Sequence, residues 1–304
     1  MKDYLYSASL ILLSIAIIIS VPFGVSFSEN YLISLQVPSN NSNVAGIQKY
    51  NSPPTPGDLS VPDLSARGVL VLDLGTDTML YQKNADERVP IASTTKIMTA
   101  IVASDYFKPN SVLTVNDGAS VIGSKVGLSR GESLDFRSLL FGLLLNSGND
   151  AAFTIAENYP GGLIGFVSAM NKEALSLGLK NTHFQNPAGL DNQNHFSSAK
   201  DLSKITKEAL KNVELARIFA TKDTQVSSLD KKYIYQLHNL NKLLSSVVGV
   251  LGVKTGYTEE AKENLVTLVN RNDHRVLFVV LGSDDRFGES TKLIDWVYSN
   301  FTWQ

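Results

Sequence analysis

The chain has 304 residues, 43% of them hydrophobic and 18% charged, with 27 basic against 29 acidic side chains. This length is sufficient for a large hydrophobic core, and the near-neutral balance gives no electrostatic reason to expect a nucleic acid as partner. Cysteine is absent, which excludes thiol catalysis, disulfides and cysteine-held metals, and the four histidines show no metal-ligand spacing.

Residues 1–28 form an apolar N-terminal segment. No charged residue occurs between Tyr4 and Ser28, and about 20 apolar residues are enough to span a bilayer as a helix. The segment is therefore expected to be either a cleaved signal peptide or a retained membrane anchor. Both alternatives send the rest of the chain across a membrane.

Residues 29–63 differ sharply in composition from the segments on either side. They hold five of the ten prolines, are rich in Asn and Ser, and show little apolar periodicity. Such a stretch buries too little surface to offset its ordering entropy, so it is expected to be a flexible linker. The globular domain is expected to comprise residues 64–304.

Within this domain the apolar period changes twice. Alternation predicts a hairpin from Gly68–Asp73 and Thr78–Gln82, and helical spacing then dominates segments 93–107, 134–145, 151–157, 162–177 and 199–212. The period then changes: Val250–Tyr257, Asn264–Asn270 and Arg275–Gly282 are expected to be three strands, and Lys292–Phe301 is expected to be a closing helix. Strands at both ends with helices between them predict an α/β (α+β) fold, in which an antiparallel sheet from both termini carries an inserted helical subdomain.

The first motif with chemical meaning is Ser93-Thr94-Thr95-Lys96, at the start of a predicted helix. Residues spaced by three lie on one helical face, so the Lys96 amine can reach the Ser93 hydroxyl. Serine is a weak nucleophile that a neighbouring amine can activate. The string alone is weak evidence, because Ser197–Lys200 and Ser228–Lys231 also match it.

Two further motifs occur later in the chain. Ser147-Gly148-Asn149 interrupts the helical middle, where a hydroxyl and an amide could relay a proton and hold a carbonyl; an ordinary helix end would contain the same residues. Lys254-Thr255-Gly256 lies on a predicted strand, where a cation and a hydroxyl can bind a carboxylate; a solvated strand end is the plain alternative. The three motifs in this order, each on the kind of element that its chemistry needs, are far less frequent by chance than any one of them alone.

This trio resembles that of the low-molecular-mass penicillin-binding proteins, specifically the serine-type D-alanyl-D-alanine carboxypeptidases. The similarity extends to the residues around each motif and to a stretch between the second and third motifs. The similar segments are Pro90–Thr99, Ser147–Ala151, Asn186–Leu190 with His195 and Asp201-Leu202, and Lys254–Thr258. The resemblance covers the chain from about residue 66 to the C-terminus and implies an acyl-transferring serine enzyme that acts on peptidoglycan stem peptides.

The resemblance also implies a role for each residue. Ser93 would attack the D-Ala–D-Ala carbonyl, Lys96 would take its proton and Ser147 would pass a proton to the leaving D-Ala. Asn149, Lys254 and Thr255 would hold the peptide and its terminal carboxylate, and the backbone N–H groups of Ser93 and Tyr257, beside Gly256, would form the oxyanion hole. No metal or organic cofactor is needed, and β-lactam antibiotics would be covalent inhibitors.

Two features depart from the family pattern. Many members carry a further β-rich domain and a C-terminal amphipathic anchor helix, whereas the sequence after Gly256 only completes the sheet and last helix. This favours membrane attachment through the N-terminus, on the outer face of the cytoplasmic membrane, or a secreted or periplasmic protein if the leader is cleaved. In addition, Ala261-Lys262-Glu263-Asn264 stands where the family usually has Ala-Gly.

Four other interpretations of the sequence compete with this one. Gly127–Gly131 fits the Gly-x-Ser-x-Gly string of α/β-hydrolases but lies in a predicted loop. A class A-like β-lactamase needs a Glu-x-x-x-Asn string, and Glu208–Asn212 matches it only as the charged face of a predicted helix. A D,D-transpeptidase would use the same residues with an amine acceptor. A membrane-tethered, non-catalytic β-lactam or wall-peptide sensor is disfavoured, because only Met1–Asp3 precede the apolar segment.

Overall fold

Residues 52–57 and 60–303 are described by the computed structural model, and they belong to the compact unit Pro38–Gln304. The expected leader or anchor at 1–28 and most of the expected linker lie outside the described residues. No helix in the described ranges combines the length and apolarity needed to cross a membrane.

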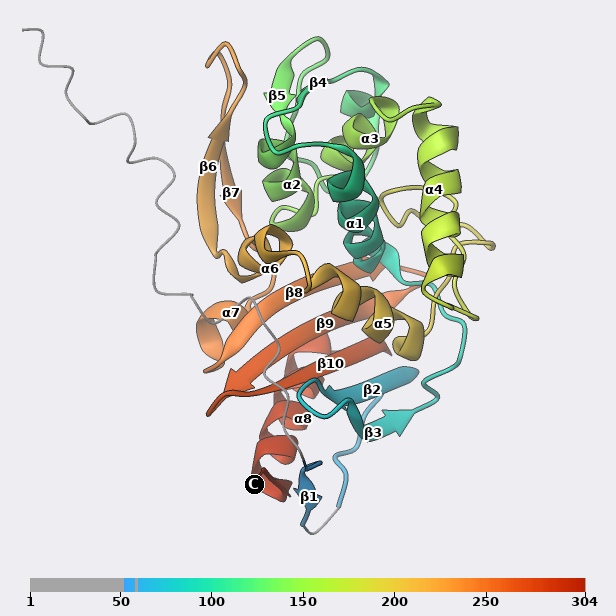
Figure 1. Cartoon of the computed structure of the whole chain (residues 1–304), viewed down its shortest axis with the longest axis vertical. Helices are drawn as coiled ribbons and strands as arrows, with labels where there is room; N and C mark the ends of the chain where they lie inside the picture. The colour runs from blue at the N-terminus through green and yellow to red at the C-terminus, as the bar shows by residue number, and fades with distance from the viewer. Residues whose placement is uncertain (1–51, 58–59, 304) are drawn as a thin grey trace, which may run out of the picture. The chain divides into compact units, whose positions relative to one another are not determined.

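The centre of the fold is a five-stranded antiparallel sheet made from both ends of the domain (Figure 1). The strands follow the order β3-β2-β10-β9-β8, so the N-terminal hairpin pairs with the C-terminal meander. Their bounds are β3 Thr78–Lys83, β2 Gly68–Asp73, β10 His274–Ser283, β9 Lys262–Arg271 and β8 Val250–Thr258. The predicted fold is confirmed, and β8 forms an edge of the sheet.

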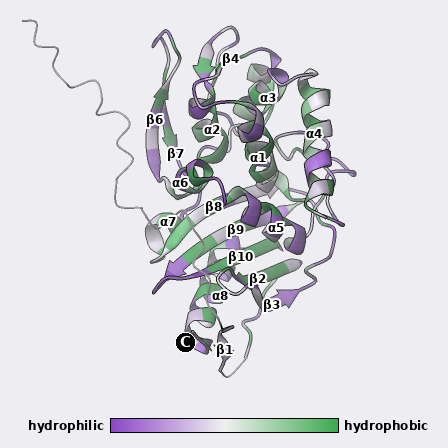
Figure 2. Ribbon diagram, viewed as in Figure 1, coloured by the Kyte–Doolittle hydropathy of each residue, from purple (hydrophilic) through white to green (hydrophobic). Residues whose placement is uncertain are grey.

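The two faces of the sheet pack into two separate cores. Strand side chains alternate between faces, so Val276, Phe278 and Val280 of β10 join one core while Leu277, Val279 and Leu281 join the other. Helix α8, Arg286–Asn300, covers the first face, and α5, Ala199–Ala209, lies against the second. Because both faces are buried, the central strands are almost continuously apolar (Figure 2).

The inserted subdomain is built around α1, Lys96–Tyr106, whose first eight residues are all buried. Helix α1 packs against α2, α3, α4 and α5, which explains why it lacks a polar face. The other helices are α2 Phe136–Leu144, α3 Asn149–Glu157, α4 Gly162–Ser176, α6 Val213–Ala220 and α7 Leu243–Ser246. Asp135 caps α2 by accepting a hydrogen bond from Ser138 N at 2.7 Å.

Several short pairings were not predicted. The hairpins are β4 Val112–Thr114 with β5 Ser133–Asp135, and β6 Asp223–Ser227 with β7 Ile234–His238. The helix expected from residue 134 therefore begins only at Phe136, after β5. These strands are too short, and mostly too exposed, to show an alternating apolar pattern.

The ends of the domain also pair with each other. Strand β1, Thr55–Pro56, lies antiparallel to β11, Phe301–Thr302. Glu289 of α8 accepts hydrogen bonds from the backbone of Ser65 and Ala66, and from Ser283 Oγ at 2.6 Å. Part of the expected linker, Thr55–Pro56, is thus a strand of the domain.

Candidate active site

Ser93 lies in a 3-10 turn, Ala92–Thr95, that leads directly into α1. The preceding Ala92 has a φ of +44°, a left-handed conformation that is costly for a residue with a side chain. The backbone of two glycines packs closely against this turn. An added Cβ on Gly189 would lie 1.8 Å from Ala92 O, and one on Gly256 would lie 3.1 Å from Ser93 N. The predicted nucleophile is therefore held between the loop containing Gly189 and strand β8.

The amine of Lys96 has three hydrogen-bond partners. Its Nζ lies 2.9 Å from Ser93 Oγ, 2.8 Å from Asn149 Oδ1 and 2.7 Å from Ala188 O. The Asn149 amide donates through Nδ2 to Ile122 O at 2.7 Å, which turns its oxygen toward Lys96. Two of the three partners are thus pure acceptors, and only Ser93 can itself donate a hydrogen bond to the amine.

Burial makes the amine of Lys96 easy to deprotonate. Lys96 is fully buried, and desolvation holds its pKa well below the ordinary lysine value. The positive charge of Lys254 lowers that pKa further, while Asp150 partly opposes the shift. A neutral amine then has two hydrogens for Asn149 and Ala188, and one lone pair for the Ser93 hydroxyl.

Ser147 lies between α2 and α3, and Asn149 is the first residue of α3, so the motif interrupts the helical middle as predicted. Ser147 is 2% exposed with a φ of +58°, another strained backbone in the site. Asp150, directly after the motif, accepts hydrogen bonds from Val126 N, Gly127 N and Leu128 N at 2.9, 2.8 and 3.1 Å. The Gly-x-Ser-x-Gly string is therefore part of a loop that hydrogen bonds to Asp150 hold next to the second motif.

The third motif lies on the edge strand β8, next to the Ser93 turn. Lys254 and Thr255 are buried, while Tyr257 is 59% exposed. Burial, and then the charge of Arg286, lowers the pKa of Lys254 to about 7. The sheet edge thus presents a buried cation beside the nucleophile.

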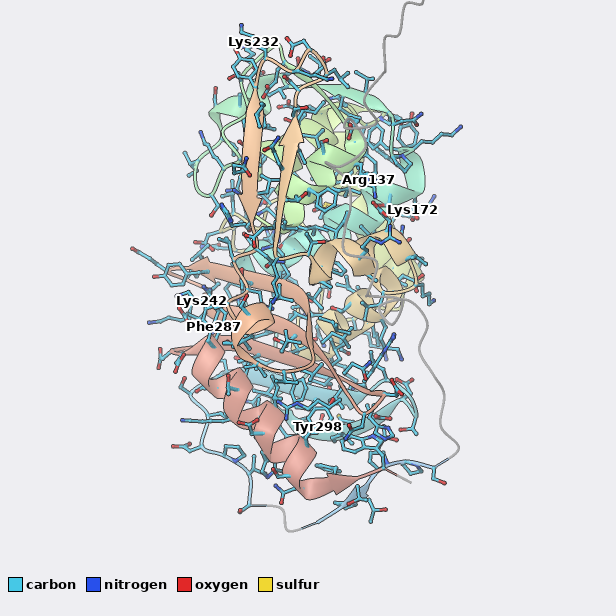
Figure 3. The ribbon with its side chains drawn as sticks, turned by 90° about the vertical axis from the view of Figure 1, so that its left-hand side faces the viewer. Arg137, Lys172, Lys232, Lys242, Phe287 and Tyr298 are labelled. Carbon is cyan, nitrogen blue, oxygen red and sulfur yellow. The ribbon has the colours of Figure 1, made fainter. Side chains whose placement is uncertain are left out.

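Arg286 is a further candidate that sequence reasoning missed. Its Nη1 donates to Gly256 O at 2.9 Å, and its guanidinium stacks 4.9 Å from the ring centroid of Phe287. Lys242 lies on the same ring at 5.7 Å, and Lys242 and Phe287 can be followed in Figure 3. Arg286 opens α8, far along the chain from β8, and belongs to no local motif, so only the folded structure reveals it.

The strings that competed with the motifs lie elsewhere. Ser197 Oγ is 2.8 Å from Thr182 Oγ1, and Ser228 Oγ bonds to Asp230 at 2.6 Å. Glu208 is on α5, paired with Lys211 at 2.6 Å, in a pocket that it shares with Asp105 and Glu173. None of these groups contacts Ser93 or Lys96 in the described structure.

Ser93, the buried amine of Lys96 and the edge-strand cation of Lys254 meet here between a helical subdomain and an antiparallel sheet. These features define the class of serine acyltransferases that includes the penicillin-binding proteins. The family profile described as D-alanyl-D-alanine carboxypeptidase matches residues 55–285, and the chain belongs to this family of serine peptidases.

Curated relatives are named either as carboxypeptidases or as an endopeptidase. The chain is 37% identical over 246 residues to the D-alanyl-D-alanine carboxypeptidase DacF of Bacillus subtilis, covering 78% of this chain and 63% of that protein. It is 34% identical over 276 residues to the D-alanyl-D-alanine endopeptidase of Pseudomonas aeruginosa, covering 88% of this chain and 89% of that protein. The chain therefore spans less than two thirds of the Bacillus relative.

Among solved structures, the crystal structure of a Streptomyces DD-transpeptidase superposes with a TM-score of 0.75 at 34% identity. The match covers 79% of this chain and 100% of the other. Proteins similar to this chain are thus named as a carboxypeptidase, an endopeptidase and a transpeptidase.

Proposed function

We propose that this protein is a serine-type D-Ala-D-Ala carboxypeptidase that removes the terminal D-alanine from peptidoglycan stem peptides. The proposal rests on the hydrogen bonds of the Lys96 amine. Its Nζ lies 2.9 Å from Ser93 Oγ, and its other two partners, Asn149 Oδ1 and Ala188 O, can only accept hydrogen bonds. This arrangement leaves a lone pair for the serine proton and requires no third residue to activate the nucleophile.

Acylation proceeds from that geometry. Lys96 takes the Ser93 proton as Oγ bonds to the carbonyl carbon of the penultimate D-Ala. Backbone N–H groups of Ser93 and Tyr257 are suited to bind the resulting oxyanion. Collapse breaks the amide bond, and the leaving amine receives the proton through Ser147. Water then attacks the ester carbonyl: Lys96 takes a proton from the water and passes it to Ser93 Oγ as the ester bond breaks, which releases the shortened peptide with a new carboxylate.

The terminal carboxylate is expected to lie against the cations of the sheet edge. Lys254, Thr255 and Arg286 supply two charges and a hydroxyl within one strand end and the start of α8. A free carboxylate stabilises both cations, whereas an amide in its place would leave them unpaired. This preference supports cleavage at a chain end. β-Lactams, which carry the same carboxylate beside an acylating carbonyl, are the expected covalent inhibitors.

The deciding experiment measures D-alanine release from diacyl-L-Lys-D-Ala-D-Ala by the purified protein and by its Ser93→Ala variant. Release by the wild type and none by the variant is the expected result. A correctly folded wild type that releases no D-alanine would overturn the carboxypeptidase assignment.

A transpeptidase is the second candidate, because the Streptomyces structure that superposes on this chain is a DD-transpeptidase. Both reactions share the acyl-enzyme and differ only in whether water or an amine resolves it. Adding a glycyl peptide acceptor to the same assay separates them. Transfer product that grows at the expense of hydrolysis would identify a transpeptidase.

We also propose that the catalytic domain works outside the cytoplasmic membrane, attached through the apolar segment at 1–28. The support is the uncharged stretch Tyr4–Ser28 and a substrate class that occurs in the wall. Mass analysis of the protein made in its native host distinguishes an intact N-terminus from a cleaved one. Accumulation of the active protein in the cytoplasm would contradict this placement.

A further inference from the structure

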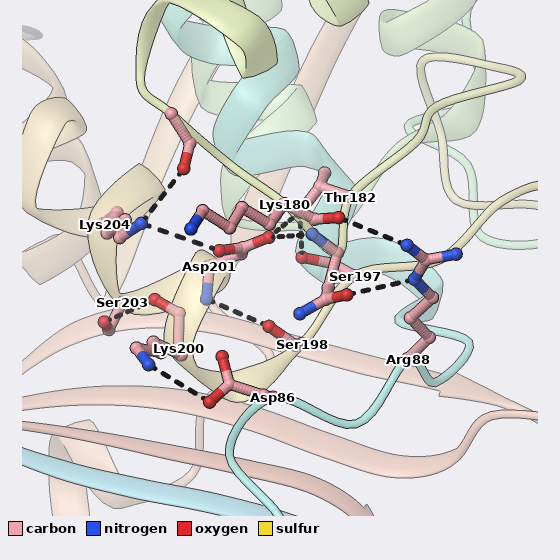
Figure 4. Close-up of polar contacts among 12 residues, drawn as sticks. Asp86, Arg88, Lys180, Thr182, Ser197, Ser198, Lys200, Asp201, Ser203 and Lys204 are labelled. Carbon is pink, nitrogen blue, oxygen red and sulfur yellow. Dashed lines mark hydrogen bonds and ion pairs between the residues drawn. The ribbon is translucent and has the colours of Figure 1, made fainter.

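Residues 181–198, named here the back-wall segment, contact Lys96 through Ala188 and are held in place at both ends. Figure 4 shows the polar contacts around Thr182 and Asp201. At one end, Asp201 Oδ2 accepts hydrogen bonds from Asn181 N at 2.7 Å and Thr182 Oγ1 at 2.9 Å. At the other end, Ser197 and Val89 exchange backbone hydrogen bonds of 2.8 and 3.1 Å. The ends of the segment are thereby fixed to the body of the domain.

The middle of the back-wall segment holds the carbonyl that orients Lys96. Asn186 Oδ1 accepts hydrogen bonds from the backbone N–H groups of Ala188, Gly189 and Leu190 at 3.1, 2.8 and 3.0 Å. This turn directs Ala188 O to within 2.7 Å of Lys96 Nζ. The direction of one hydrogen of the base therefore depends on the conformation of this turn.

His195 connects that turn to the nucleophile motif. It is 3% exposed, its Nε2 lies 2.7 Å from Thr95 Oγ1, and its Nδ1 accepts a hydrogen bond from Gln185 N at 3.1 Å. A backbone N–H can only donate, so Nδ1 carries the lone pair and the hydrogen of a neutral ring is on Nε2, donated to Thr95. One ring thus joins the residue before Lys96 to the residue before Asn186.

The ring is suited to this fixed role because it stays neutral. Burial, and then the nearby His183 and Lys96, lower the pKa of His195 to about 4. A neutral imidazole adds no positive charge beside the base, and it keeps one donor and one acceptor in place throughout the neutral range.

We propose that His195 is a positioning residue for the general base, which joins Thr95 to the Asn186 turn so that Ala188 O holds the Lys96 amine against Ser93. The proposal rests on the acyl-enzyme function proposed above. His195 bonds to neither Ser93 nor Lys96, so its effect must pass through backbone geometry. Misplacing a reacting group by about 1 Å can cost about 100-fold in rate.

The test measures acylation by a fluorescent penicillin in single-turnover experiments, which separate the dissociation constant of the first complex from the acylation rate constant. Replacing His195 by Leu is expected to lower the rate constant by about 10- to 100-fold, with the dissociation constant changed less than about twofold. His195→Gln, which keeps a donor and an acceptor, is expected to recover part of the rate.

Thr95→Val removes the hydroxyl partner with little change of shape and covers the case in which the Leu variant does not fold. Its loss of rate should not add to that of His195→Leu in the double variant, because both remove the same hydrogen bond between Thr95 Oγ1 and His195 Nε2. His183→Leu is the matched control: it lies in the same segment, bonds to Asn194 O at 2.7 Å, and should leave acylation unchanged.

Three results would refute the positioning role. They are wild-type rate constants in folded His195→Leu and Thr95→Val, additive losses in the double variant, or an equal loss in His183→Leu. Failure of the acyl-enzyme function on which this proposal rests is distinguishable, because then the wild type would not be acylated and Ser93→Ala would behave identically. Failure of the carboxypeptidase assignment alone appears only in the D-alanine release assay.

Discussion

Lys96 can accept a proton only when its amine is neutral, and its burial depresses its pKa to make this possible. An arginine at this position would keep its charge at all working pH values. We therefore expect Lys96→Arg to abolish acylation, measured as the covalent mass shift after incubation with benzylpenicillin. Circular dichroism serves as the control for folding. A normal mass shift in this variant would exclude Lys96 as the base.

Lys254 has the opposite requirement, because a carboxylate ligand binds to its charged form. With a pKa of about 7 in the free protein, Lys254 loses its charge as the pH rises above that value. Binding of acetyl-D-alanyl-D-alanine should therefore weaken from pH 6 to 9, by at most about tenfold per pH unit. The Ser93→Ala variant separates this binding from chemistry in isothermal titration calorimetry.

The matched variant for this pH dependence is Lys254→Arg in the same Ser93→Ala background. Because arginine stays protonated, its binding of the dipeptide should be nearly independent of pH over this range. Arg286 contributes a constant charge in both proteins. If both proteins lose affinity in parallel, the titrating group is not Lys254.

At the scale of elements, the nucleophile turn is shaped by a close backbone contact. A Cβ on Gly189, at a φ of +86°, would lie 1.8 Å from Ala92 O. Gly189→Ala should therefore lower the free energy of unfolding well beyond the roughly 1–2 kcal/mol of a left-handed alanine alone, and should slow acylation. Urea unfolding and penicillin acylation measure the two effects.

Gly127 provides the comparison, since its φ is +99° and an added Cβ would meet nothing within 4 Å. Gly127→Ala should lower the free energy of unfolding only by the cost of placing an alanine in a left-handed conformation, because the added Cβ meets no neighbouring atom. It therefore measures that cost separately from the clash at Gly189. Equal destabilisation by the two alanines would show that the contact with Ala92 is unimportant.

Elements with a long apolar period could be predicted from the sequence, whereas contacts between distant segments could not. Strand β10 is apolar over most of its length because its two faces join two cores, so the sequence could indicate it. Two-residue strands such as β1 have no period to detect. Arg286 was missed because it reaches the third motif only through the fold: it lies at the start of α8, 30 residues after Gly256, whose carbonyl its Nη1 contacts. No pattern in the neighbouring sequence indicates this contact.

At the scale of the whole molecule, the two ends of the domain pair with each other in a small two-stranded sheet, separate from the central sheet. Strand β1 pairs with β11 after the end of α8 (Figure 1), while Ser93 lies in the 3-10 turn that contacts β8. Trp303 adds to this closure: its Nε1 donates to Asp73 Oδ1 at 2.9 Å, and it stacks 5.3 Å from Tyr298. The pairing of the domain ends and the Ser93 turn thus lie in separate regions of the described structure.

This separation predicts the effect of shortening the chain. A protein that starts at residue 64 loses the β1–β11 pairing, including the hydrogen bond from Gly57 N to Asn300 O, while one that starts at residue 52 keeps it. We expect the shorter protein to have a free energy of unfolding lower by about 1 kcal/mol, measured by urea unfolding. Its acylation rate constant should be unchanged. Equal stability would show that the added strand contributes nothing, and slower acylation would show that the two regions are coupled.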